Sequence, residues 1–127
     1  MSRDADPEPG TVLVIEDGAR LREATTAYDH RVAGVVSGAG AYRPGIVLDR
    51  RESDSPRASV ALVGKVMCKA DAAYGPIKCG DLLTTSDTPG HAMKATDASR
   101  YAGAVLGKAL GALDGGCGFV PILVALQ

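Results

Sequence analysis

Glycine and proline interrupt this chain so often that it cannot build long regular elements. Sixteen glycines and seven prolines are spread over 127 residues, and many of the segments between them are aliphatic and β-branched. Such segments are typical of short strands joined by tight turns. We therefore expect an all-β fold, a small barrel or sandwich of about eight short, mainly antiparallel strands with little helix.

The expected strands are apolar runs bounded by turn-forming residues. The polar segment 20–29 between the first two strands is ambiguous, and Asp97 is expected to cap one helical turn that ends at Tyr101. Pro121 lacks an N–H donor, which predicts an edge position or a bulge for the last strand. The expected strands are Thr11–Glu16, Arg31–Ser37, Ile46–Asp49, Ser59–Ala70, Asp81–Ser86, His91–Thr96, Ala104–Leu110 and Gly118–Leu126.

The strand Ser59–Ala70 has the clearest alternation in the chain. Val66 and Cys68 fall on one parity, together with Val60, Leu62 and Ala70, whereas Lys65 and Lys69 fall on the other. A period of two residues predicts a strand with one buried face and places Cys68 inside.

The tripeptide Thr88-Pro89-Gly90 predicts a tight turn. Proline favours the first corner of a type II turn, and glycine accepts the positive φ of the second corner. The turn therefore predicts a hairpin between Asp81–Ser86 and His91–Thr96 and fixes its register.

One domain with one core is expected. Residues 1–9 hold two prolines and alternating acids, which indicate an extended arm, and residues 10–127 are expected to form a single β domain. A chain of this length buries enough surface to fold without disulfide bonds or bound metal ions. Only five residues are aromatic, Phe119 and four tyrosines, so the core is expected to be aliphatic. The charged segment 50–57 predicts a solvated loop.

Charge and hydropathy exclude two classes of partner. The net charge is −1, with 14 basic and 15 acidic residues, whereas electrostatic binders of nucleic acid show a basic excess on one face. The longest apolar run, Phe119–Leu126, is too short to span a bilayer and is broken by Pro121. The polar, acidic N-terminus predicts cytoplasmic synthesis without a signal peptide. Membership of a released or surface-associated particle stays open.

Three cysteines, Cys68, Cys79 and Cys117, cannot all pair within one chain. Their spacing contains no C-x-x-C motif, so it predicts neither a zinc site nor a redox pair. Reduced thiols are the favoured interpretation, and Cys79 with Cys117 is the pair to expect if a bridge forms. Cys68 is expected to be buried and inert, with the other two more accessible.

No catalytic, cofactor or metal constellation is expected. His30 and His91 have no further ligand at the spacing of a metal site. Asp29 and His30 would need a distant serine for a triad, and nothing in the sequence selects one. The serines considered, none of which lies in a G-x-S-x-G motif, are Ser37, Ser86 and Ser99.

Two other polar patterns have structural interpretations. The glycines of Gly34–Gly40 do not precede a helix, so they indicate a β-turn and not a phosphate loop. Asp81 is expected to accept backbone N–H bonds of the turn that it enters. Four lysines, Lys65, Lys69, Lys78 and Lys94, are expected to share one outer, solvated face, with contact to an acidic partner or a neighbouring subunit as the alternative.

Two stretches carry a family resemblance. They are Y-G-P-I-K-C-G-D-L-L-T-T-S-D-T-P-G-H-A-M-K-A (residues 74–95) and G-A-V-L-G-K-A-L (residues 103–110), preceded by Y-D-H-R-V-A-G-V-V-S-G (residues 28–38). Residues 28–127 thus resemble β-rich appendage modules of phage-type and large bacterial repeat proteins, of the peptidase G2 kind. More distantly, they resemble decoration proteins of phage capsids. The resemblance implies modules that cap fibres or coat shells, commonly as trimers. Self-cleavage is known in the G2 group, but no autoproteolytic motif matches here.

The leading functional hypothesis is a structural assembly module and not an enzyme. Val60–Val63 and Phe119–Leu126 are apolar on both strand faces, whereas a small antiparallel sheet usually has one polar face. Excess apolar surface indicates a partner, and a symmetric homo-oligomer, with a trimer favoured, would cover it. The particle would be phage-like or surface-associated. The alternative is an autoproteolytic or hydrolytic domain whose site forms between subunits. A small-molecule binding barrel is disfavoured because aromatic residues are few.

Overall fold

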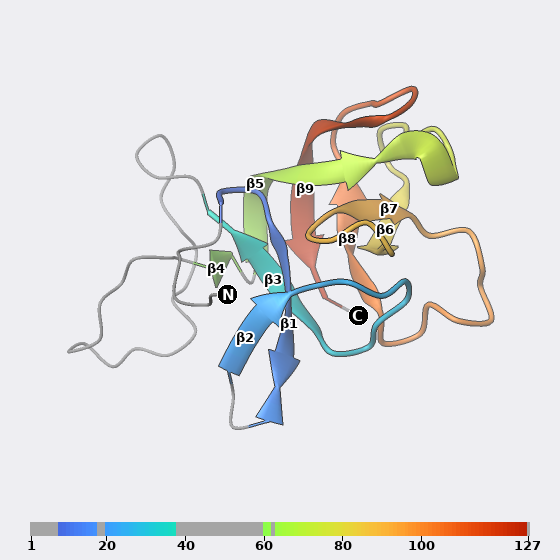
Figure 1. Ribbon diagram of the computed structural model, residues 1–127. Helices are drawn as coiled ribbons and strands as arrows, with labels where there is room; N and C mark the ends of the chain where they lie inside the picture. Colours follow the sequence, from blue (N-terminus) through green and yellow to red (C-terminus); the bar gives the residue numbers. More distant parts are fainter. Residues whose placement is uncertain (1–7, 18–19, 38–59, 62, 127) are drawn as a thin grey trace.

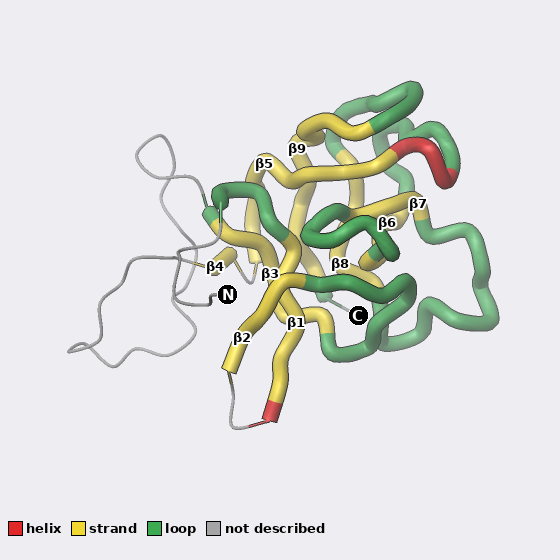
Figure 2. The backbone as a smooth tube through the Cα atoms, in the orientation of Figure 1, coloured by secondary structure: helices red, strands yellow, loops and turns green. Residues whose placement is uncertain are grey.

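The computed structural model describes residues 8–17, 20–37, 60–61 and 63–126. Within these ranges the chain is almost entirely β, with nine strands in two sheets (Figure 1). Helix there is confined to short pieces at the end of the first strand and over Ala72–Tyr74 (Figure 2). The expected all-β fold with little helix is confirmed.

The first sheet has four antiparallel strands in the order β2-β1-β3-β4. The segment that was ambiguous in the sequence supplies β2, because Leu21 pairs opposite Ile15 and packs with Leu13 and Val36. The strands are β1 (Val12–Glu16), β2 (Arg20–Glu23), β3 (Val32–Val36) and β4 (Val60–Ala61).

The second sheet is a closed barrel with the strand order β5-β7-β6-β8-β9. Its longest ladder joins β5 to β9, from Val63 opposite Ala125 to Asp71 opposite Cys117. All ladders are antiparallel except the short parallel contact of β5 with β7, where Ala70 pairs with Ala92. The strands are β5 (Val63–Asp71), β6 (Leu82–Thr85), β7 (Ala92–Lys94), β8 (Val105–Ala109) and β9 (Cys117–Ala125).

One aliphatic core joins the two sheets. Val14 and Val35 of the first sheet belong to the same buried cluster as Cys68, Leu106 and Ile122 of the barrel. Burying apolar surface is the main favourable term in folding, at roughly 25 cal/mol per Å². The expectation of an aliphatic core is confirmed for the described residues, since this cluster contains neither Phe119 nor any of the tyrosines within the described ranges.

The expected strand Ser59–Ala70 is divided between the sheets. Val60–Ala61 pairs with β3, whereas the chain from Val63 onward pairs with β9. Gly64 has φ 106° just after the division, a conformation that glycine adopts without strain. Within β5 the alternation is as expected, with Val66, Cys68 and Ala70 buried. The expected strand Ile46–Asp49 and the loop 50–57 lie outside the described residues.

The prediction for Pro121 was wrong. Strand β9 is not an edge strand, because β5 pairs along one whole side of it and β8 pairs with Ile122–Val124 on the other, and no register shift occurs at Pro121. The ladder with β8 ends at Ala109 opposite Ile122. Pro121 is the next residue, and its carbonyl accepts from Leu110 N at 2.7 Å. Pro121 therefore lies where β8 ends and a missing donor costs little.

The expected helical turn from Asp97 to Tyr101 is also corrected. Asp97 Oδ1 accepts a hydrogen bond from Ser99 N at 3.0 Å, as the side chain of an N-cap residue would. However, Arg100 N donates to Asp97 O at 2.9 Å, and the chain forms a turn instead of a helix. The Tyr28 hydroxyl oxygen accepts from the backbone N–H groups of Thr96 and Asp97. The bonds to Tyr28 hold the start of this segment in a non-helical conformation.

The turn at Thr88-Pro89-Gly90 is confirmed. Gly90 has φ 74°, and His91 N donates to Thr88 O at 3.0 Å. The two strands pair as expected, with Thr84 opposite Met93. Gly90 also joins the barrel to the first sheet, since its N–H donates to Ala24 O at 2.7 Å and its carbonyl accepts from Val12 N at 2.9 Å.

Replacing Gly90 by valine is expected to lower the free energy of unfolding by about 2 kcal/mol or more. A side chain at positive φ costs about 1–3 kcal/mol. The added Cβ would also lie 2.8 Å from Glu23 Oε2 and 3.1 Å from Thr11 Cγ2. Urea denaturation of the variant and the parent measures the difference.

Two further glycine-to-valine variants separate these causes. Gly103 has φ 80° with nothing within 4 Å of an added Cβ, and Gly115 has open space without a positive φ. Gly103→Val should show the backbone strain alone, and Gly115→Val should remain near the parent. If Gly90→Val were as stable as Gly115→Val, this turn would not support the joint between the sheets.

Candidate functional site

The outer surface of β5 and β9 is the main exposed apolar surface of the described chain. Phe119 is 55% exposed and Met67 50%, and Leu110 and Leu123 are each 39% exposed. Because side chains alternate along a strand, the buried residues Val120, Ile122 and Val124 of β9 leave its outward positions for apolar residues as well. We call this surface the β5–β9 face; it consists of Met67, Leu110, Phe119, Pro121 and Leu123.

The strand register arranges this face in rows. The middle row is Leu110, Pro121 and Met67, where Leu110 N donates to Pro121 O and Pro121 pairs opposite Met67. Leu123 lies in the row on one side and Phe119 in the row on the other. The Phe119 ring covers Gly10, since a Cβ added there would lie 2.8 Å from Phe119 Cε2. The register therefore makes these residues neighbours: Phe119, Pro121 and Leu123 take successive outward positions on β9, and Met67 and Leu110 flank Pro121.

Three lysines lie next to the apolar residues of the face. Leu123 is paired with Lys65 on β5 and with Lys108 on β8. Phe119 is paired with Lys69, which forms an ion pair with Glu8. The hydrogen bond and charge of Lys69 lower the pKa of the Glu8 carboxyl. Within the described ranges Lys65 and Lys108 have no ion-pair partner.

The four lysines expected on one face lie in two places. Lys65 and Lys69 are on β5, but Lys78 and Lys94 lie beside Asp81. Asp81 Oδ2 accepts from Lys78 N at 2.8 Å and is 3.6 Å from Lys94 Nζ. The expected turn-stabilising role of Asp81 is confirmed. The separation arises because Lys78 precedes β6 and Lys94 belongs to β7, whereas Lys65 and Lys69 belong to β5.

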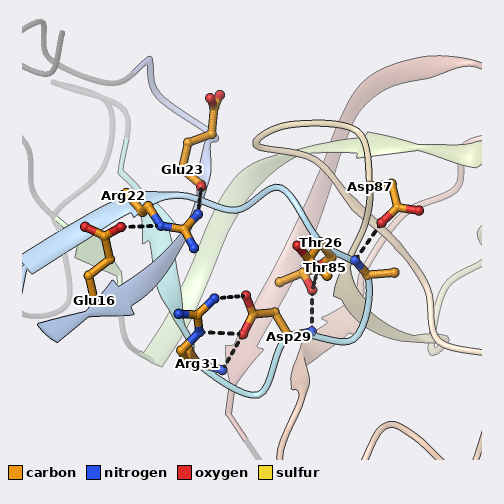
Figure 3. A network of polar contacts seen from close by, with 9 residues as sticks. Glu16, Arg22, Glu23, Thr26, Asp29, Arg31, Thr85 and Asp87 are labelled. Atoms are coloured by element: carbon orange, nitrogen blue, oxygen red, sulfur yellow. Dashed lines mark hydrogen bonds and ion pairs between the residues drawn. The ribbon is translucent and has the colours of Figure 1, made fainter. Parts of the chain in front are cut away.

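Asp29 is engaged in a structural network and not in a triad. Figure 3 shows Arg31 bound to both oxygens of Asp29, at 3.1 Å from Nε and from Nη2. Asp29 N donates to Thr85 Oγ1 at 2.8 Å, and that hydroxyl donates to Thr26 O at 2.6 Å. Burial would raise the pKa of the Asp29 carboxyl, but the hydrogen bonds and charge of Arg31 outweigh it and lower the pKa.

The other candidate residues also have structural contacts. His91 Nδ1 is 2.8 Å from Pro89 O, and His30 is exposed. Ser86 donates to His91 O at 2.7 Å, and Ser99 donates to Asp97 Oδ1 at 2.6 Å. Ser37 is buried at the end of β3, and Gly34 lies within that strand. Residues 38–40 of the expected turn lie outside the described residues.

One polar cluster was not foreseen. Asp71 is 8% exposed, accepts from Thr88 Oγ1 at 2.7 Å and from Ala73 N at 2.9 Å, and pairs opposite Cys117. These hydrogen bonds lower the pKa of the Asp71 carboxyl. Partial desolvation, followed by the charge of Asp71, raises the pKa of the Cys117 thiol. A nucleophilic cysteine needs the opposite shift.

The cysteines are free thiols with the expected exposure. Cys68 is fully buried, and burial raises the pKa of its thiol to about 12. Cys79 and Cys117 are exposed. The described residues contain no group of three His, Cys, Asp or Glu side chains that could hold a metal ion. They also contain no helix with the length and hydropathy of a membrane span.

The sequence interpretation missed Met67 and Leu110 as surface residues. Met67 has the same parity as Lys65 and Lys69, so the alternation of β5 carried this signal. Leu110 carried no such signal, because its place in the face depends on the contact with Pro121. Tyr28 was also missed. It has φ 53°, and Arg100 lies 4.6 Å from the centre of its ring.

Comparisons with protein-family models, with curated proteins and with solved structures found no match. The resemblance of residues 28–127 to appendage modules therefore stays a prediction.

Thiol labelling of the native protein should modify Cys79 and Cys117 and spare Cys68. In Asp71→Asn the labelling rate of Cys117 should rise at a given pH, and its pH profile should move to lower pH, because the charge that raises the thiol pKa is gone. Peptide mapping by mass spectrometry identifies each site. Cys79 serves as the internal control, and an unchanged Cys117 profile would contradict the coupling.

Asp29→Asn is expected to lower stability by about 1 kcal/mol at pH 7. A depressed carboxyl pKa stabilises the fold above the unfolded value of about 3.9, and this contribution is lost as pH falls through the folded value. The difference in free energy of unfolding between parent and variant, measured by urea denaturation, should therefore become smaller below about pH 4. Asp114→Asn, at an exposed loop residue, is the control. A gap that stayed constant down to pH 2 would argue against the Arg31 interaction.

Proposed function

We propose that this protein is a structural assembly module that forms symmetric homo-oligomers, most simply trimers, through the β5–β9 face. The observation that carries the proposal is the contiguous apolar surface of Met67, Leu110, Phe119, Pro121 and Leu123. The particle would be phage-like or surface-associated, and the module would act without catalysis.

The face has the physical properties of a protein contact. Monomeric proteins rarely expose large contiguous apolar patches, and covering this one would gain roughly 25 cal/mol per Å². All of its residues except Leu110 stand on the longest ladder of the barrel, which pairs without interruption from Val63 to Asp71. A rigid surface loses little conformational entropy on association, which favours affinity.

The polar clusters support a structural role over the hydrolytic alternative. The Asp29 carboxylate is occupied by Arg31, and desolvation together with the charge of Asp71 raises the pKa of the Cys117 thiol, the opposite of what a nucleophile needs. The Asp29 carboxylate accepts from Arg31, and the Asp71 carboxylate accepts from Thr88 Oγ1, which fastens the turn at Thr88 to β5. The phage-like setting and the trimer rest on the sequence resemblance and on symmetry.

Light scattering at micromolar concentration should give a mass near three times 13.0 kDa. Phe119→Ser and Met67→Ser should each shift the particle toward the monomer, because truncating a central apolar anchor costs about 2 kcal/mol or more. That cost corresponds to roughly a 30-fold increase in the dissociation constant.

Ile15→Ser is the matched control, since Ile15 is 40% exposed on β1 and lies outside the face. It should leave the mass unchanged. Circular dichroism and thermal melting verify that each variant is folded. A parent that stays monodisperse and monomeric would refute the proposed function.

A further inference from the structure

The charged side chains next to the β5–β9 face do not neutralise one another. Lys65 and Lys108 flank Leu123 without an ion-pair partner in the described chain, and Lys69 is already neutralised by Glu8. The face therefore carries an excess of two positive charges. Since the whole chain has a net charge of −1, the rest of the molecule carries −3.

A two-fold contact of this face with itself would bring like charges together. If the axis ran along the strands, the row of Lys65 and Lys108 would meet its own copy. If the axis ran across the strands through Pro121, that row would meet the row of Phe119 and Lys69. In both arrangements two faces that each carry an excess of two positive charges come together, and neither face offers an uncommitted carboxylate. Like charges at an interface oppose association.

We propose that the β5–β9 face docks on a different, net negative surface of a second copy of this chain, so that the contact is heterologous. This inference rests on the proposed function and specifies the partner surface. A heterologous contact closes into a ring when its rotation allows, and every contact in a three-fold ring is of this kind. The lysines then frame an apolar contact and select a partner surface of opposite charge.

Mixing the parent with a face variant tests the proposal. Met67→Ser/Phe119→Ser loses the face but keeps the other surface, so in a heterologous contact the parent face can still bind it. Native mass spectrometry of isotope-labelled parent with excess variant should show mixed species and fewer parent trimers. Variant alone should be monomeric, and unlabelled parent should exchange freely into mixed trimers.

The outcomes separate this inference from the proposed function. A monomeric parent, or a variant that still forms trimers, would overturn the proposed function. A parent oligomer together with a monomeric variant that never joins it would show a self-complementary face and overturn this inference alone. The salt dependence of association is a second test. Raising the ionic strength should weaken a contact between opposite charges and strengthen a contact between like charges.

Discussion

The antiparallel ladder between β5 and β9 is the interaction on which the rest of the structure depends. It brings residues near the end of the chain against its middle, and it gives the barrel its longest wall. Its inner side supplies Cys68, Val120 and Ile122 to the common core. Because side chains alternate, the same ladder must present Met67 and Phe119 outward. Core and candidate contact surface are thus two sides of one pairing.

Polar contacts determine how the first sheet and the segment before β3 are attached to the barrel. The first sheet reaches the barrel through backbone bonds at Gly90, and the segment before β3 reaches it through Asp29 and Thr85. These bonds satisfy buried groups that would otherwise cost about 1–3 kcal/mol each. The Asp29 and Asp71 carboxylates, whose pKa values are lowered, likewise accept hydrogen bonds within the fold.

Local patterns made much of the fold predictable. The alternation in Ser59–Ala70 placed Cys68 inside, and the Pro89-Gly90 pair predicted both a turn and a hairpin register. The errors occurred where the result depended on a distant segment. Pro121 was expected at an edge, but β8 ends beside it, and Asp97 was expected to start a helix, but Tyr28 binds the backbone there.

The sequence by itself determined short strands, their inward parity and the turns, because these depend on neighbouring residues and on the backbone preferences of glycine and proline. It also indicated that Phe119–Leu126 is apolar on both sides. Only the tertiary structure decided which strands pair, that Leu110 joins Met67 across Pro121, and that Lys65 and Lys108 flank Leu123. Strand pairing is a contact between residues far apart in the chain, and periodicity within one strand carries no information about its neighbour.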